Sequence, residues 1–291
     1  MKCIASTIEG NWALYNGDCV DVLQGLPEAS VDYSIFSPPF ASLYTYSNSP
    51  RDMGNCRNTD EFFEHFSHLV RELRRVIKPG HNVSFHCMQL PTSKVRDGVI
   101  GLRDFRGDLI RAFEAQGFIY ASEVCIWKDP VTAMQRTKAL GLLHKTIRTN
   151  ATMSRQGIAD YLVTMRAPGD VVDKVDHGSD IPVDEWQKLA SPVWMDINPN
   201  ETLQYRSARE HDDERHICPL QLEVIRRGVR LWTKPGDVVL TPFAGIGSEV
   251  FIAAELGRRG VGVELKTSYY EQAVRNLRAS ADQSSLFGDL L

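Results

Sequence analysis

Short apolar strands alternate with amphipathic helices along most of this 291-residue chain. The clearest helix is predicted over residues 60–77, where apolar side chains recur at helical spacing and Lys78-Pro79-Gly80 ends the pattern. Residues 31–36 and 82–88, on either side of it, have the β-branched and aromatic content of strands. This alternation predicts an α/β fold, with a mostly parallel sheet and helices on both of its faces.

The regular alternation is interrupted between residues 128 and 215. Residues 128–155 carry six Lys and Arg against one acid, a local charge of +5, whereas residues 156–215 carry six basic and thirteen acidic side chains, or −7. Neither segment shows long periodicity, so we expect an inserted, irregular region there. A chain of this length forms one large or two modest domains. We expect one α/β domain, built from residues 1–127 and 216–291 and split by the insertion.

The composition limits where the chain acts and what it binds. Hydrophobic residues make up 43% and charged residues 24%, and no run of about 18 apolar residues occurs, so no membrane association is expected. Residues 1–9 lack the apolar core of a signal peptide, which favours a cytoplasmic location. The net charge of −4 excludes a polycation that coats nucleic acid, but not a local basic patch. The six cysteines lack metal-binding spacing, and no metal site is expected.

A glycine-bearing loop follows a buried strand predicted over residues 238–241. Gly245 and Gly247 let the backbone approach a ligand at the start of a helix, whose N-terminus favours an anionic group. Glu264, seventeen residues after Gly247, ends the next predicted strand, where a carboxylate accepts hydrogen bonds from ribose hydroxyls. Val250 stands in place of the third glycine of a dinucleotide site. The pattern disfavours NAD and favours a smaller adenosine cofactor such as S-adenosylmethionine, with a purely structural tight turn as the alternative.

A second loop, Ser37-Pro38-Pro39-Phe40, ends the strand predicted over residues 31–36. The two prolines fix the backbone and have no N–H to donate, while their carbonyls can still accept. The Ser37 hydroxyl and the Pro38 carbonyl suit an exocyclic NH₂ group, and Phe40 suits stacking on a base flipped out of a duplex. The alternative is a strand-terminating turn with a phenylalanine in the core.

With these two loops, the chain resembles the DNA amino-methyltransferases, which transfer a methyl group from S-adenosylmethionine to adenine N6 or cytosine N4. The family's catalytic signature, Asp, Asn or Ser followed by Pro-Pro and an aromatic residue, is matched by residues 37–40. Its cofactor signature, Asp-Pro-Phe-x-Gly-x-Gly-Thr, corresponds to residues 241–248, with Thr241 in place of Asp, and its Gly-Asp-Cys element to Gly17-Asp18-Cys19. The catalytic signature precedes the cofactor signature, which is the circularly permuted order of the β class, and the layout is similar to phage-borne and orphan enzymes.

The resemblance implies a fold, a cofactor, partners and a set of site residues. The fold is a Rossmann-like methyltransferase sheet with helices on both faces, in which residues 128–215 are the inserted target-recognition region. The cofactor is S-adenosylmethionine, and the partners are double-stranded DNA and a second copy of the chain in a homodimer. The implied catalytic residues are Ser37, Pro38, Pro39 and Phe40. The residues implied in cofactor binding are Asp18, Cys19, Pro219, Leu220, Phe243, Ala244, Gly245, Gly247, Ser248 and Glu264.

The basic segment between the two methyltransferase-like halves is the expected DNA contact. Lys and Arg side chains there suit phosphates and base edges, although a basic run is about as often a solvated face. Tyr44 and Tyr46 follow the catalytic loop and are expected to close over the flipped base, or else to lie in an ordinary polar loop. The expected DNA-binding residues of the basic segment are Lys128, Arg136, Lys138, Lys145, Arg148 and Arg155.

Two features point to different target bases. Serine at position 37 is more usual in cytosine-N4 enzymes of the family, whereas many phage-borne and orphan enzymes of similar layout act on adenine. We favour methylation of adenine N6, with cytosine N4 as the alternative. A second alternative is a non-catalytic DNA-binding protein on a methyltransferase scaffold, against which the intact catalytic signature argues. No part of the sequence indicates a recognition sequence or a restriction partner.

Overall fold

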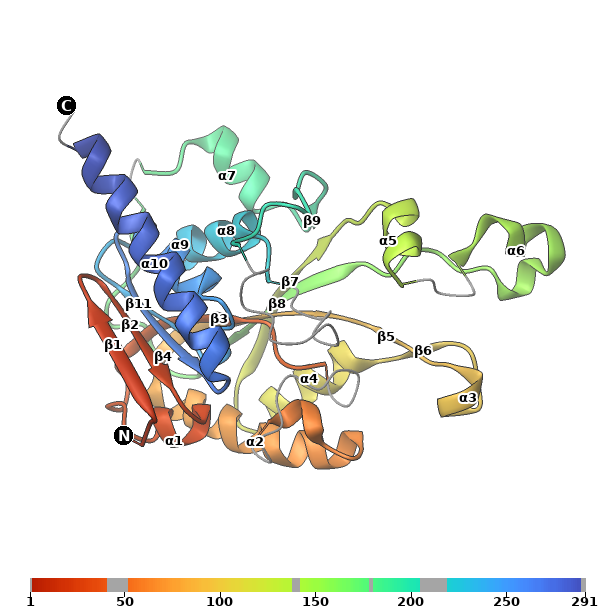
Figure 1. Ribbon diagram of the computed structural model, residues 1–291, viewed down its shortest axis with the longest axis horizontal. Coiled ribbons are helices and arrows are strands. Elements are labelled where there is room, and N and C mark those ends of the chain that lie inside the picture. Colours follow the sequence, from red (N-terminus) through yellow and green to blue (C-terminus); the bar gives the residue numbers. More distant parts are fainter. Residues whose placement is uncertain (1, 41–51, 138–141, 178–179, 205–218, 289–291) are drawn as a thin grey trace.

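A nine-stranded mixed sheet forms the centre of the protein in a computed structural model that describes residues 2–40, 52–137, 142–177, 180–204 and 219–288 (Figure 1). From edge to edge, its strands are β1 (Ala5–Glu9), β2 (Trp12–Asn16), β11 (Arg259–Glu264), β10 (Val238–Thr241), β3 (Val31–Phe36), β4 (Ile77–Met88), β8 (Asp160–Arg166), β7 (Ile119–Ile126) and β9 (Val193–Trp194). The strands from β2 to β4 run parallel, while β8 is antiparallel to both β4 and β7. The predicted α/β fold with a mostly parallel sheet is confirmed.

Helices cover both faces of this sheet, below and above it in Figure 1. On one face, α1 (Cys19–Leu23), α2 (Thr59–Val76) and α4 (Phe105–Glu114) enclose a core rich in phenylalanine. On the other face, α8 (Leu222–Trp232), α9 (Ser248–Glu255) and α10 (Thr267–Gly288) pack on the alternate side chains of the same strands. None of the helices in the described ranges is both long and apolar enough to cross a membrane.

The winding of the chain reverses between the neighbouring strands β10 and β3. From β10, α9 leads to β11 on one side, whereas from β3, α2 leads to β4 on the other side. Open α/β sheets bind ligands beyond the carboxyl ends of their strands at such a reversal. Both loops singled out in the sequence follow these two strands, residues 37–40 after β3 and residues 242–247 after β10. The fold therefore places them at one common edge.

The segment between residues 128 and 215 is more regular than the sequence suggested. Asp160–Arg166 forms β8, a strand paired with both β4 and β7, so the expectation of an irregular segment is wrong there. The region also contributes α5 (Pro130–Thr137), α6 (His144–Thr149), α7 (Val183–Leu189) and β9. The division into two catalytic halves and a target-recognition region stays a prediction, but part of the middle segment completes the sheet.

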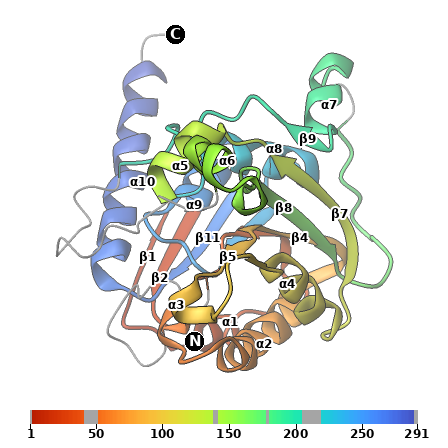
Figure 2. The ribbon, with the colours of Figure 1, turned by 90° about the vertical axis from the view of Figure 1, so that its right-hand side faces the viewer.

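Two arms project from the molecule, to the right in Figure 1 and towards the viewer in Figure 2. One arm continues from β4 as the hairpin of β5 (Leu90–Pro91) and β6 (Leu102–Arg103), with α3 (Lys94–Asp97) at its tip. The other continues from β7 and contains α5, α6 and the 3₁₀ helix η4 (Ala151–Met153) before the chain returns as β8. A further 3₁₀ helix, η2 (Met53–Asn55), precedes α2. Both arms thus extend beyond the carboxyl ends of strands in the sheet.

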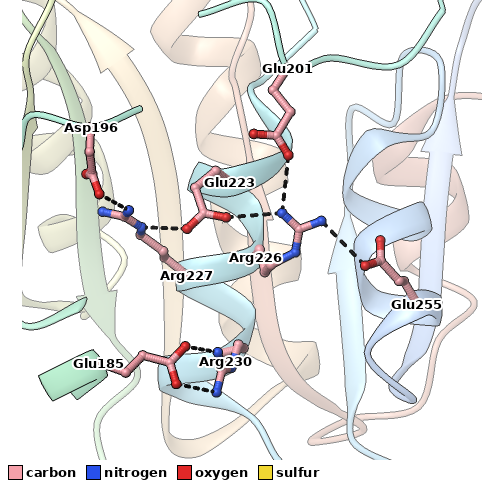
Figure 3. Close-up of polar contacts among 8 residues, drawn as sticks. All are labelled: Glu185, Asp196, Glu201, Glu223, Arg226, Arg227, Arg230 and Glu255. Atoms are coloured by element: carbon pink, nitrogen blue, oxygen red, sulfur yellow. Dashed lines mark hydrogen bonds and ion pairs between the residues drawn. The ribbon is translucent and has the colours of Figure 1, made fainter. Parts of the chain in front are cut away.

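A strap, residues 180–204, lies along α8 and is held there by three arginines of that helix (Figure 3). Arg230 binds the carboxylate of Glu185 in α7 with both terminal nitrogens. The Arg227 guanidinium donates to Asp196 at 2.8 Å and lies 5.1 Å from the ring centre of Trp194. The remaining contacts of this cluster join Arg226 to Glu201, Glu223 and Glu255, and Arg227 to Glu223. The strap is therefore joined to the central sheet in two ways, through β9, which pairs with β7, and through these side-chain contacts with α8.

Candidate active site

The loop after β3 and the loop after β10 lie side by side. The Ser34 hydroxyl donates to the Leu240 carbonyl at 2.9 Å across the paired strands. Directly beyond, the rings of Phe36 and Phe243 are in contact, with their centres 5.7 Å apart. Ser37 follows Phe36, so the fold brings the predicted catalytic loop next to the predicted cofactor loop.

The glycine loop after β10 is tied to the end of β11. The backbone N–H of Gly245 donates to Glu264 Oε2 at 2.8 Å, and that of Lys266 donates to Glu264 Oε1 at 2.8 Å. Gly247 has a φ of +92°, and a Cβ there would lie 3.1 Å from the Ala273 Cβ in α10. A side chain at this position would therefore be strained by its backbone conformation and by α10. The loop needs glycine to keep both its path and its contact with that helix.

Two buried hydroxyls flank this loop without hydrogen-bond partners among the described residues. They are Thr241 Oγ1 at the end of β10 and Ser248 Oγ at the start of α9, in residues only 1% and 2% exposed. Buried polar atoms normally have partners, so a polar ligand at the loop would satisfy them. At Gly245 no atom lies within 4 Å of the position of a Cβ, which leaves the backbone open to a ligand. These features fit an adenosine cofactor.

Glu264 lies at the end of β11 beside the glycine loop, and its binding of a ribose stays a prediction. Burial raises the pKa of its carboxyl group to about 7, although the N–H groups of Lys266 and Gly245 act in the opposite direction. Glu249 is buried in the first turn of α9, and burial, with a contribution from the charge of Glu264, raises its pKa to about 8. The site therefore holds two carboxyl groups, those of Glu264 and Glu249, whose raised pKa values lie near neutral pH.

Asp18 lies beside Glu264 because β2 and β11 are paired. Asn16 at the end of β2 is opposite Glu264, and the Gly17 N–H donates to the Glu264 carbonyl at 2.9 Å. The Asp18 carboxylate caps α1 by accepting the N–H groups of Val20 and Asp21. Cys19 is buried, and burial raises the pKa of its thiol, so the group stays neutral. The Gly-Asp-Cys element thus lies next to Glu264, and the cofactor contacts of Asp18 and Cys19 stay predictions.

A chain of polar contacts runs behind the catalytic loop. Ser37 Oγ lies 3.2 Å from Nδ1 of His86, and Nε2 of the same ring lies 3.1 Å from Asp160 Oδ2. The Lys128 ammonium contacts that carboxylate oxygen at 2.5 Å. Sequence reasoning missed His86 and Asp160, because only the register of β4 against β8 shows that they lie together. Lys128 was expected to bind DNA, and here its ammonium is paired with Asp160.

Other predicted site residues lie in the apolar core or near it. Phe40 is half-buried with its ring centre 6.3 Å from that of Phe105, so its stacking on a base stays a prediction. Leu220 is 4% exposed and packs in the core on the α8 side of the sheet. Pro219 precedes α8, which begins at Leu222. Cofactor contacts of Pro219 and Leu220 stay predictions.

The expected DNA-binding residues are distributed over the arm after β7 and the catalytic loop. Lys145 and Arg148 are exposed on α6. Arg155 is half-buried, and burial lowers the pKa of its guanidinium. Arg136 lies on α5 with its side chain outside the described part of the chain. Lys138, Tyr44 and Tyr46 also lie outside the described residues.

A methyltransferase is the class of protein that this sheet and these two adjoining loops define. A comparison with protein families makes the assignment specific, because the model of the DNA methylase family of N6 and N4 enzymes matches residues 31–275. The chain belongs to this family. It is a DNA amino-methyltransferase that uses S-adenosylmethionine, as the resemblance implied.

Curated relatives extend over most of the chain. The Type II methyltransferase M.BglII of Bacillus subtilis is 25% identical over 279 residues, which are 95% of this chain and 72% of that protein. The Type II methyltransferase M.BamHI of Bacillus amyloliquefaciens is 23% identical over 256 residues, which are 87% of this chain and 54% of that protein.

Solved structures share the fold. The DNA modification methylase TTHA0409 of Thermus thermophilus, complexed with S-adenosyl-L-methionine, has a TM-score of 0.67 and 24% identity over 91% of this chain and 93% of that chain. The PvuII DNA methyltransferase, described as cytosine-N4-specific, has a TM-score of 0.63 and 19% identity over 91% of this chain and 86% of that chain. At these identities the likeness concerns the fold.

Proposed function

We propose that this DNA amino-methyltransferase acts at a specific DNA sequence on cytosine N4. The observation that carries the choice of base is Ser37 at the catalytic position, since the adenine enzymes that the chain resembles typically have Asp there. Adenine N6, which the layout of the sequence favoured, is the second candidate.

The residues of the catalytic loop make a poor nucleophile more reactive. The lone pair of an exocyclic amine is delocalised into the ring of the base. The Ser37 hydroxyl and the Pro38 carbonyl each accept one N–H of the amine, which favours a pyramidal nitrogen with a localised lone pair. S-adenosylmethionine, when bound at the glycine loop, supplies the electrophilic methyl group. Because the two loops adjoin, positioning provides much of the rate.

We further infer that the DNA duplex is held by the arms. The exposed Lys145 and Arg148 on α6 supply positive charge for phosphates at the side of the sheet where the catalytic loop lies. A base flipped from that duplex would enter at Ser37. The homodimer implied by the resemblance stays a prediction.

The test is expression of the protein in a host without DNA methylation, followed by single-molecule sequencing of the host genome. We expect N4-methylcytosine in one sequence context. N6-methyladenine as the only product would overturn the choice of base. Purified protein that binds S-adenosylmethionine but modifies no DNA would favour the non-catalytic alternative. Ser37→Ala serves as the matched control, because it should retain cofactor binding and lose most methylation.

A further inference from the structure

Four polar side chains from four segments meet behind the catalytic loop. Ser37 follows β3, His86 lies near the end of β4, Asp160 begins β8, and Lys128 follows β7. Cross-strand partners share a face of a sheet, and so do residues two apart on one strand. His86 is paired with Leu162, two residues after Asp160, so the imidazole and the carboxylate lie on one face. The sheet register, and not chance contact at a surface, brings these groups together.

We propose that His86 and Asp160 are positioning residues that take up, through the Ser37 hydroxyl, the proton that the amine loses during methyl transfer. This inference rests on the proposed function of Ser37 as the acceptor for the amine. It assigns a role to two side chains that are not part of the Ser-Pro-Pro-Phe signature. His86 lies between Ser37 and Asp160, at 3.2 Å and 3.1 Å, so one ring joins the hydroxyl to the carboxylate.

The ionisation state of Asp160 determines in which direction a proton can move through the His86 imidazole. Burial alone would raise the pKa of the Asp160 carboxyl group, but the His86 ring and the Lys128 ammonium outweigh it and lower the pKa. Asp160 is therefore a carboxylate that can only accept. Nε2 of His86 faces this carboxylate at 3.1 Å, and with the ring hydrogen on that nitrogen, Nδ1 presents a lone pair to the Ser37 hydroxyl. Ser37 can then donate its own hydrogen to Nδ1 while its oxygen accepts the amine.

Two buried polar atoms of this cluster lack hydrogen-bond partners within the described part of the chain. His86 Nε2 and Asp160 Oδ1 are buried, and neither has an aligned hydrogen-bond partner among the described residues. A cluster that served only to join β4 to β8 would be expected to satisfy its buried polar atoms. Ser84 lies two residues before His86 on the same face of β4. Its hydroxyl is hydrogen-bonded to the hydroxyl of Thr164 in β8 at 2.8 Å, so the buried polar atoms of that pair have partners. A small rotation of the imidazole would align Nε2 with Asp160 and satisfy this atom when the ring becomes charged.

The proton and the electrons balance along this path. As the amine nitrogen bonds to the methyl carbon, the bond from that carbon to the sulfonium sulfur breaks with its electron pair on sulfur. The nitrogen becomes cationic and releases one hydrogen to Ser37 Oγ, whose own hydrogen moves to Nδ1 of His86. The imidazolium lies beside the Asp160 carboxylate and later returns the proton to water. A serine hydroxyl cannot hold this proton near neutral pH, whereas an imidazole can.

The primary test is the single-turnover methylation rate of His86→Asn. Asparagine places a polar group near the position of Nδ1, but it cannot take up a proton. We expect the rate to fall about 100-fold, the lower part of the range for general acid–base catalysis, with Kd for DNA and for S-adenosylmethionine unchanged. Asp160→Asn removes the charge that supports the imidazolium and should lower the rate by about tenfold.

A double-mutant cycle separates this role from a structural one. In a Ser37→Ala background the path for the proton is already broken, so His86→Asn should lower the residual rate by less than about twofold. A purely structural role of His86 would lower it by the same factor as in the wild type, which would overturn the proposal. Ser84→Ala is the matched control, since it removes a contact between the same two strands and should leave the rate unchanged.

Two outcomes distinguish failure of this inference from failure of the proposed function. If the wild-type protein methylates no exocyclic amine, the proposed function itself fails. If it does, and both His86→Asn and Asp160→Asn methylate within about threefold of its rate, only the role of these two residues is overturned. Should His86→Asn fail to fold, Asp160→Asn alone decides between these results.

Discussion

The carboxylate of Glu264 accepts the backbone N–H of Gly245 at 2.8 Å, which joins the end of β11 to the loop after β10. Its second oxygen accepts the N–H of Lys266 at 2.8 Å. The acid is therefore held in a fixed orientation before any ligand binds. A carboxylate oriented in this way loses little freedom when it accepts ribose hydroxyls, so its contribution to cofactor affinity is expected to be large.

Replacing Glu264 with glutamine should weaken cofactor binding. The amide oxygen of glutamine can still accept a hydrogen bond. The NH₂ group cannot, so one donor, either a ribose hydroxyl or a backbone N–H, loses its acceptor. Loss of a hydrogen bond to a charged group costs about 1.5–3 kcal/mol, so we expect Kd for S-adenosylmethionine to rise about 10- to 100-fold by calorimetry. Glu255→Gln, at a partly exposed glutamate of α9, is the matched control and should bind the cofactor as the wild type does. Equal Kd values for all three proteins would contradict the assignment of Glu264.

The cofactor affinity should also depend on pH. The pKa of Glu264 is raised to about 7, so the carboxyl group is largely protonated at pH 6 and largely ionised at pH 7.5. Only the ionised form has both oxygens available as acceptors, so affinity should increase as pH rises, by up to about eightfold over this interval. Calorimetric titration at both pH values measures the change. In Glu264→Gln the dependence should disappear, and an affinity that falls with rising pH would contradict the assignment.

Gly247 should be the glycine of the cofactor loop that tolerates substitution least. Its φ of +92° disfavours any side chain, and a Cβ would lie 3.1 Å from the Ala273 Cβ. We expect Gly247→Ala to lower the free energy of unfolding by about 2–3 kcal/mol in urea denaturation. Gly257→Ala, at a φ of +74° with no atom within 4 Å of the new Cβ, should cost only about 1 kcal/mol. An equal loss of unfolding free energy in the two variants would mean that the contact between residue 247 and α10 has no effect on stability.

The sequence predicted the parts of this fold that depend on local pattern. Residues 31–36 and 238–241 were both expected as strands and are β3 and β10, because each is a buried run with a proline-bearing loop directly after it. β8 was missed, since its pairing with β4 and β7 joins segments far apart in the chain. His86 and Asp160 were missed for the same reason. Their common face depends on the register of β4 against β8, which no local pattern records.

The basic residues of α6 should contribute to DNA affinity without affecting the cofactor. Lys145 and Arg148 are exposed, so each can neutralise about one phosphate. Replacing both with glutamine should lower the slope of log K against log salt by about 2 and weaken binding of all duplexes alike. Fluorescence anisotropy with a labelled duplex at several salt concentrations measures the slope. Lys188→Gln, at an exposed lysine of α7, is the control, and a slope lowered equally in that variant would argue against α6 as the contact.

Arg227 should be the arginine of α8 on which the strap depends most. Its side chain is 7% exposed, compared with 26% for Arg226, and it contacts Glu223 and Asp196 (Figure 3). It also lies over the ring of Trp194. Loss of this buried cation removes the arginine partner of Asp196, leaves Glu223 with Arg226 alone, and opens space above Trp194. We expect Arg227→Ala to lower the free energy of unfolding by about 2 kcal/mol, and Arg226→Ala by less than about 1 kcal/mol.

Hydrogen exchange locates the effect of the same substitution. Amide protons in β9 should exchange about tenfold faster in Arg227→Ala than in Arg226→Ala, because Trp194 of β9 belongs to the strap and Arg227 packs on its ring. Protection of β3 and β10 should stay as in the wild type, since those strands are bonded within the sheet and not to the strap. Uniform loss of protection across all three strands would show instead that Arg227 stabilises the whole domain and has no particular role in fastening the strap to α8.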